Sequence, residues 1–135
     1  MQKLNRLTEK EREVVEKIIE RTKSDSSVLA VALFGSSARG EPYNDIDICI
    51  FLNPAKYESS YLSKKYLNYT YENEKYDIEI FQHLPMYIRE RILKDAKIIY
   101  CKDEDLLYEL YYQTIRELGH YRPIYEEYLE EVING

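Results

Sequence analysis

Two apolar runs separated by a short polar segment form the clearest pattern in the chain. The first covers Val28 to Phe34 and is mostly aliphatic, and the second covers Ile46 to Leu52, with Ile or Leu at every other position. Apolar runs of this length, rich in β-branched residues, are typical of buried strands. The segment between them holds two glycines and a proline, which predict a short helical turn followed by a tight turn.

A helix is expected before the first strand. The run Thr8-Glu9-Lys10-Glu11 is a capping box, in which the first and fourth residues satisfy free N–H groups at a helix start. An apolar stripe with helical spacing follows it, made of Val14, Val15, Ile18 and Ile19. We therefore predict a helix from about Thr8 to Lys23.

The segment after the second strand predicts one helix and leaves one stretch ambiguous. Asn53-Pro54 indicates a helix start, and the spacing of apolar residues continues the helix to about Leu67. From Tyr69 to Glu72 aromatic and polar residues alternate, so this stretch could instead be an extra strand that turns back through Asn73-Glu74-Lys75.

Three further elements are expected before residue 102. Tyr76–Phe81 and Lys97–Cys101 have strand patterns, and Pro85 suits the first turn of a helix that reaches about Asp95. We expect this helix to turn its apolar side chains inward and its cations outward onto a solvated face; the alternative is that these cations steer triphosphate toward the site. The inward set is Tyr87, Ile88, Ile92 and Leu93, and the outward set is Arg89, Arg91 and Lys94.

The C-terminal part predicts two helices. Asp103 or a neighbour caps the first, which covers residues 104–118, and Gly119 ends it as a left-handed cap. Pro123 then starts a second helix that reaches about Ile133.

Length and composition bound the fold. A chain of 135 residues with 44% hydrophobic residues can bury one core and is too short for two ordinary domains. We expect a single domain, 1–135, of the α/β (α+β) class, in which a small mixed sheet with packed helices occupies about 28–101. The two C-terminal helices would form an extension over about 103–133.

Charge and cysteine content narrow the function classes. The net charge is −6, and residues 103–135 hold nine acidic and two basic residues, which argues against nucleic acid as a partner. No apolar run has the length of a membrane span and no signal-peptide core is present, so we expect a cytoplasmic protein without a membrane contact. Cys49 and Cys101 lie in strand patterns far apart, and we expect small core residues there.

The turn after the first strand has the chemistry of a phosphate site. A glycine at position 35 would let a ligand approach the backbone, and a helix that starts at Ser36 would point unpaired N–H groups at it. Helix N-termini favour anions. The Ser36 and Ser37 hydroxyls and the guanidinium of Arg39 would add further donors.

Two carboxylates open the second strand. Asp45 and Asp47 are two residues apart and therefore project from one face of a strand. A divalent cation with oxygen ligands, most simply Mg²⁺, would offset their repulsion. The alternative is that Asp45 caps the turn while Asp47 faces solvent. Against it, Cys49 and Phe51 continue the aspartate face as non-polar positions, so both faces of the strand are apolar.

The segment as a whole resembles the signature of minimal nucleotidyltransferases in the DNA polymerase β superfamily, the MNT type paired with HEPN-domain toxins. The resemblance rests on Gly35-Ser36-x-Ala38-Arg39-Gly40 followed by Asp45-Ile46-Asp47. It implies a polymerase β-like nucleotidyltransferase fold in which the Gly-Ser helix start holds nucleotide phosphates. It also implies three carboxylates on adjacent strands that bind two Mg²⁺ ions. The chain departs from the pattern in its short turn before Asp45 and in Asn44, where the family often has serine.

The resemblance also assigns roles to individual residues. Asp77 lies several residues before Leu84-Pro85, the offset of the family's third carboxylate, so Asp77 would be the third metal ligand and the general base. Glu79, on the same face of the third strand, is the second choice, and a solvated edge-strand position is the alternative for both. Gly35, Ser36 and Arg39 would bind the nucleotide.

The activity implied by the resemblance is the transfer of NMP, with AMP expected, from an NTP to a hydroxyl acceptor. The acceptor would be a tyrosine of a HEPN-domain partner, which makes the chain an antitoxin. Two alternatives stay open: a catalytically quiet module that neutralises a partner by binding it, and a small-molecule transferase. Whether the chain forms a homo-oligomer is also left open.

Overall fold

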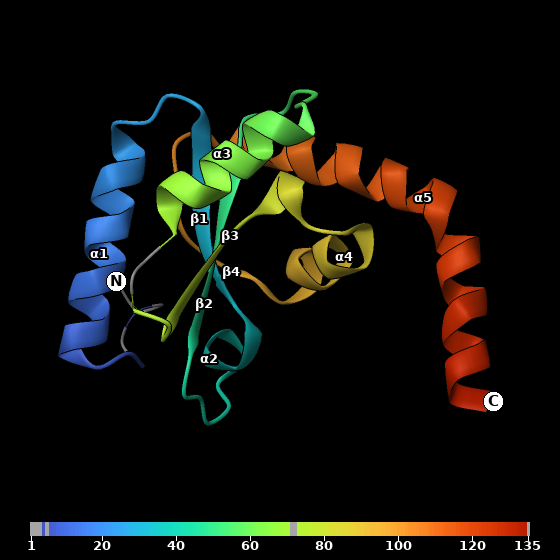
Figure 1. The fold of residues 1–135 in the computed structure, drawn as a ribbon, viewed down its shortest axis with the longest axis horizontal. Coiled ribbons are helices and arrows are strands. Elements are labelled where there is room, and N and C mark those ends of the chain that lie inside the picture. Colours follow the sequence, from blue (N-terminus) through green and yellow to red (C-terminus); the bar gives the residue numbers. More distant parts are fainter. Residues whose placement is uncertain (1–3, 5, 71–72, 135) are drawn as a thin grey trace.

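In a computed structural model of the chain, residues 4, 6–70 and 73–134 are described, without the side chains of residues 120–134. Helices and strands alternate along the sequence (Figure 1). In chain order the elements are α1 (Glu9–Lys23), β1 (Val28–Phe34), α2 (Gly35–Arg39), β2 (Ile46–Leu52), α3 (Ser59–Tyr69), β3 (Tyr76–Ile80), the 3₁₀ turn η2 (Phe81–His83), α4 (Met86–Asp95), β4 (Lys97–Cys101) and α5 (Glu104–Asn134).

Within the described residues, the strands form one mixed sheet in the order β3-β2-β1-β4. β1 is antiparallel to both β2 and β4, whereas β2 and β3 are parallel and are connected through α3. The end of β1 and the starts of β2 and β3 therefore lie side by side at one end of the sheet. We call this end the carboxylate end, because Asp45, Asp47 and Asp77 lie there.

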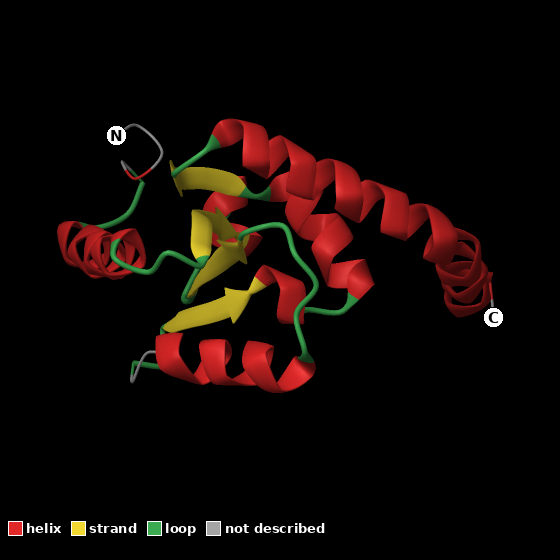
Figure 2. Cartoon of the chain, turned by 90° about the horizontal axis from the view of Figure 1, so that it is seen from above, coloured by secondary structure: helices red, strands yellow, loops and turns green. Residues whose placement is uncertain are grey.

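Helices cover both faces of the sheet (Figure 2). On one face, α1 and α3 pack on the β-branched side chains that alternate along β2 from Ile46. On the other face, α4 and α5 pack on the face of β2 that includes Cys49 and Phe51. Because strand side chains alternate between the faces, Asp47 projects on the same side as Cys49, toward the α4 layer.

The predicted start of α1 is confirmed in detail. The Thr8 hydroxyl accepts from the backbone N–H of Glu11, at 3.1 Å, and the Glu11 carboxylate accepts from the backbone N–H of Thr8, at 2.8 Å. The bounds of β1, β2 and β4 also agree with the prediction.

The predicted start of α3 is wrong. Asn53 lies in a loop: its backbone N–H donates to the carbonyl of Ser27, at 3.0 Å, and its amide donates to the carbonyl of Ser26, at 2.9 Å. These bonds tie the residue to the segment before β1, so the helix begins only at Ser59. Within the possible extra strand, Tyr69 is helical and Thr70 is the C-cap of α3, while residues 71–72 lie outside the described residues.

The two predicted C-terminal helices are a single helix, α5. Among the described glycines only Gly35 and Gly40 have a positive φ, so Gly119 is not a left-handed cap. The helix continues through Pro123, which has no N–H to donate to the carbonyl of Gly119, four residues earlier. The ribbon of α5 bends in this part (Figure 1), as proline-containing helices do.

Both cysteines are free, with Cys49 buried in the core and Cys101 partly buried. Among the described residues no helix has the length and apolarity that a membrane span requires.

Candidate active site

Gly35 sits at the junction of β1 and α2 in a left-handed conformation, with φ at 73°. A Cβ atom at this position would overlap the carboxylate of Asp47. The glycine is therefore required twice, once for its backbone angle and once for the close approach of Asp47. The turn and the first carboxylate strand are packed directly against each other.

The strand register brings the predicted carboxylates together. Asp47 is opposite Phe34 on β1 and beside Asp77 on β3, while Glu79 is beside Cys49. Asp45 lies just before β2 and is exposed, as is Asp77. The two predicted acidic pairs therefore occupy adjacent parallel strands at the carboxylate end.

The electrostatics of these groups are unfavourable as they stand. Burial raises the pKa of Asp47, and the neighbouring charges of Asp77 and Asp45 raise it further, although Arg39 opposes them. Burial, the charge of Asp77 and a hydrogen bond with that side chain raise the pKa of Glu79 to about 7. Each of these carboxyl groups is thus disfavoured as an anion, first because it is partly buried and then because other carboxylates lie beside it.

The donor set suits a hard divalent cation, since every donor is a carboxylate oxygen and a bound cation would offset the repulsion. In the parts of the chain that the structure describes, however, no three His, Cys, Asp or Glu side chains are gathered closely enough to hold a metal ion. The carboxylates share one end of the sheet without converging on one point.

A cavity of about 350 Å³ adjoins Asp47 at this end. It combines residues of β1, α2 and β2 with residues of α4 that sequence reasoning did not assign to the site. The α4 residues have helical spacing, which places them on one face, but a local pattern does not reveal what that face meets. The lining consists of Phe34, Gly35, Ser36, Arg39, Asp47, Ile88, Arg91, Ile92 and Asp95.

Two arginines line this cavity, Arg39 of α2 and Arg91 of α4. The Arg39 guanidinium pairs with the Glu41 carboxylate through two contacts, at 3.1 and 3.2 Å, and this raises the pKa of Arg39. Arg91, predicted to face outward, is exposed but lines the cavity.

One predicted donor is directed away from the cavity. The buried Ser37 hydroxyl is 3.5 Å from the carbonyl of Phe34, so the expectation that it adds a donor to the site is wrong. Ser36 lines the cavity.

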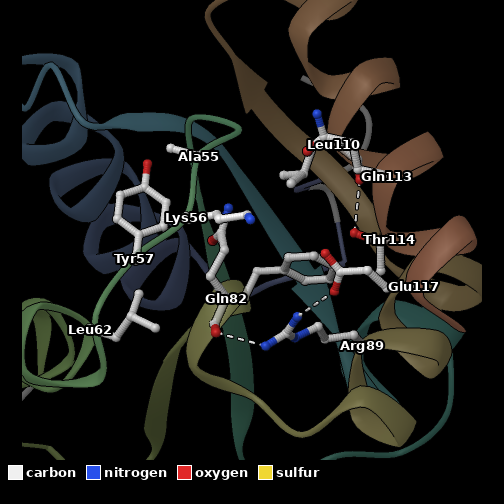
Figure 3. A pocket seen from close by; sticks show the side chains of 11 residues that line it. Ala55, Lys56, Tyr57, Leu62, Gln82, Arg89, Leu110, Gln113, Thr114 and Glu117 are labelled. Carbon is white, nitrogen blue, oxygen red and sulfur yellow. Dashed lines mark hydrogen bonds and ion pairs between the residues drawn. The ribbon is translucent and has the colours of Figure 1, made fainter. Parts of the chain in front are cut away.

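A second cavity of about 350 Å³ lies at the opposite end of the sheet, between the loop after β2, η2 and α5 (Figure 3). Arg89 points into this region and donates to the carbonyls of Leu84 and Gln82, both at 2.8 Å, while Glu117 lies 3.7 Å away. The prediction that Arg89 faces outward is wrong, because these acceptors belong to the turn before α4 and to α5. None of the predicted site residues lines this cavity.

A relative from Methanocaldococcus jannaschii, named putative protein adenylyltransferase, is 37% identical to the chain over 88 residues. The match covers 64% of this chain and 66% of the relative's length.

Solved structures have the same fold. A chain from a structure of a tri-AMPylated Shewanella oneidensis HEPN toxin in complex with MNT antitoxin matches with a TM-score of 0.60, at 17% identity, over 98% of this chain and 99% of that chain. A chain from a toxin-antitoxin structure with AMP-PNP matches with a TM-score of 0.58, at 19% identity, over 87% and 98%. These likenesses confirm the predicted α/β fold with a small mixed sheet and packed helices.

The family comparison is more specific. Residues 16–105, which are 90 of the 135 residues, match the family described as Polymerase beta, Nucleotidyltransferase. This region contains β1 to β4 and all the predicted site residues. The chain belongs to the polymerase beta nucleotidyltransferase family.

Proposed function

We propose that the chain is a Mg²⁺-dependent nucleotidyltransferase that moves AMP from ATP to a protein hydroxyl group. The observation that carries the proposal is the position of Asp47. This carboxylate lies against Gly35 in the turn and beside Asp77 on the next strand. A phosphate held at the turn would therefore be next to both carboxylate strands.

Residues on two sides of the cavity would bind the triphosphate. Gly35 and Ser36 offer backbone N–H groups, and Arg39 would exchange its Glu41 partner for phosphate oxygens. Arg91 of α4 would add a second guanidinium from the other side of the cavity. This arrangement supports a phosphate site between α2 and α4.

Asp45, Asp47 and Asp77 would hold the divalent metal, which when bound neutralises charge on the phosphates and on the oxygens entering and leaving. The register favours Asp77 over Glu79 as the third ligand, because Asp77 is the residue beside Asp47. The acceptor oxygen forms a bond to the α-phosphorus of ATP. The bond between that phosphorus and the oxygen that bridges it to the β-phosphorus breaks. Asp77 accepts the hydroxyl proton, and pyrophosphate leaves.

The acceptor class comes from the relatives. One is named putative protein adenylyltransferase, and one solved structure holds a tri-AMPylated HEPN toxin in complex with MNT antitoxin. We therefore propose a tyrosine of a HEPN-type toxin as the acceptor, with the chain as its antitoxin. A second candidate function is neutralisation by binding alone. The exposed apolar side chains of α5, Tyr108, Tyr112 and Ile115, favour a partner surface.

The test is the transfer of label from α-labelled ATP in the presence of Mg²⁺, with co-purified protein as acceptor. We expect a labelled protein band with the wild type and its loss with Asp45→Asn/Asp47→Asn. The matched control is Glu104→Gln/Asp105→Asn, which removes two exposed carboxylates far from the carboxylate end and is expected to leave transfer unchanged.

The assay is repeated with the other three α-labelled nucleoside triphosphates. If none of the four labels protein, and if wild type and Asp45→Asn/Asp47→Asn bind the partner equally, the enzyme is excluded and the binding module is supported. Label that persists in this double variant would contradict the assigned carboxylates.

A further inference from the structure

Glu11 is a buried carboxylate outside the candidate active site. The residue is only 3% exposed, although it lies in the first turn of α1. Its Oε1 accepts from the Tyr43 hydroxyl at 2.8 Å and from the backbone N–H of Thr8, and its Oε2 is 2.6 Å from the Lys75 ammonium. These hydrogen bonds and the Lys75 charge outweigh burial, so the pKa of Glu11 falls to about 2.

The partners of Glu11 belong to the two segments that carry the carboxylates. Tyr43 is two residues before Asp45, and Lys75 is two residues before Asp77. The Lys75 carbonyl also accepts from the backbone N–H of Ile46, at 2.7 Å, and Ile46 lies between Asp45 and Asp47. One buried carboxylate thus connects both segments to α1, which begins at the end of the sheet where α2 lies (Figure 1).

Arg6, which precedes α1, contacts the loop that leads from Gly40 to Asp45. A Cβ at Gly40 would overlap the Arg6 guanidinium, and the Tyr43 hydroxyl is 3.3 Å from the Arg6 carbonyl. The Arg6 side chain thus lies against the start of the loop from Gly40 to Asp45, and the Arg6 carbonyl accepts from Tyr43 near the loop's end. A capping box alone would need only Thr8 and would not explain the contacts with Tyr43 and Lys75.

We propose that Glu11, Tyr43 and Lys75 form a positioning network that sets the distance between the Asp45–Asp47 pair and Asp77. The inference rests on the proposed function, in which these aspartates bind the metal. The three residues touch neither the metal nor the substrate. They act through the two segments, as residues behind metal ligands do when they orient them.

The chain contains a matched control at the opposite end of the sheet. Asp25 accepts from the Lys65 ammonium at 2.7 Å and from the Tyr69 hydroxyl at 2.6 Å. This cluster has the same chemistry as the positioning network, a carboxylate with a lysine and a tyrosine. It contacts neither carboxylate segment.

The test measures Mn²⁺ binding to the full chain by electron paramagnetic resonance and nucleotide transfer as a function of Mg²⁺ concentration. We expect Glu11→Ala to weaken Mn²⁺ binding about tenfold, the lower range for residues that orient metal ligands. Tyr43→Phe and Lys75→Met should weaken it less, and each should raise the Mg²⁺ concentration needed for half-maximal transfer. Glu11→Gln keeps the helix cap and removes the charge, so it should resemble Lys75→Met. Asp25→Ala should leave Mn²⁺ affinity unchanged per folded molecule.

Unchanged Mn²⁺ affinity in Glu11→Ala and Tyr43→Phe, or equal weakening by Asp25→Ala, would overturn the inference. If Glu11→Ala does not fold, Tyr43→Phe decides the question, because it removes a single hydroxyl. A wild type that binds Mn²⁺ but transfers no nucleotide would overturn the proposed function, while the ranking of Mn²⁺ affinities would still test the network.

Discussion

Asp47 and Asp25 occupy opposite ends of the same sheet and have opposite electrostatic environments. Burial and the neighbouring acidic side chains raise the pKa of Asp47. Burial would also raise the pKa of Asp25, but hydrogen bonds from Lys65, Ser27 and Tyr69 outweigh it and hold that pKa well below its usual range. The fold thus places hydrogen-bond donors beside Asp25 and acidic side chains beside Asp47. A carboxylate with acidic neighbours is the one that a bound cation would stabilise most.

The largest effect is expected from an alanine at Gly35, which lies against Asp47. We expect Gly35→Ala to abolish transfer, since the added Cβ overlaps Asp47 and the left-handed angle is strained for alanine. The strain alone should lower the free energy of unfolding by about 1–3 kcal/mol. Transfer of label and urea unfolding would measure both effects.

Gly119→Ala is the control for that variant. Apart from the neighbouring residues of the helix itself, no atom of the described residues lies within 4 Å of the added Cβ, and the glycine is helical, so the change should stabilise the chain by about 0.5–1 kcal/mol. Equal activity of the two alanine variants would show that the junction of β1 and α2 has no role in transfer.

Asp25→Ala addresses the other end of the sheet. It removes hydrogen bonds to a charged acceptor and leaves the Lys65 ammonium, whose side chain is only 16% exposed, without this partner. We expect the free energy of unfolding to fall by about 2–3 kcal/mol, with transfer per folded molecule unchanged. Denaturant unfolding with a parallel transfer assay is the measurement. A large loss of transfer in the folded variant would contradict the separation of the two ends.

Stability should also depend on pH. The pKa of Glu11 is lowered to about 2 from 4.5, and that of Asp25 is lowered from 3.8. Because both values are lower in the folded state, their contributions are fully present above pH 4.5 and are lost as the pH falls toward 2. Urea unfolding at pH 7, 4.5 and 3 should show this decline, and Asp25→Ala should show a shallower one. An equal decline in wild type and variant would exclude Asp25 as a source.

Local patterns predicted most of the elements. The capping box at Thr8 and Glu11 and the apolar run of β1 depend on neighbours in sequence, and both were found as expected. Gly119 and Pro123 are also local signals, but each is only a preference, and the packing of the first half of α5 on the sheet competes with it. The helix therefore continues where Gly119 and Pro123 predicted a break.

The positions of the candidate site residues were predictable where they depend on strand periodicity. Alternation places Asp45 and Asp47 on one face, and it does the same for Asp77 and Glu79. The roles of Arg89 and Arg91 were not predictable, because helical spacing identifies a face without identifying what packs against it. For the same reason Glu11 was recognised as a cap, while its contacts with Tyr43 and Lys75 required the fold.

The parallel pairing of β2 and β3 has a consequence for the folding reaction. Two parallel neighbours need a crossover, here through α3, so Asp77 reaches Asp47 only after a long-range loop has closed. An unfolded or partly folded chain would lack the complete set of carboxylates. A ligand that binds both strands would therefore bind the native state alone and add about 2.7 kcal/mol to its stability at a hundredfold excess over Kd. Occupancy of the site and completion of the fold would be thermodynamically linked.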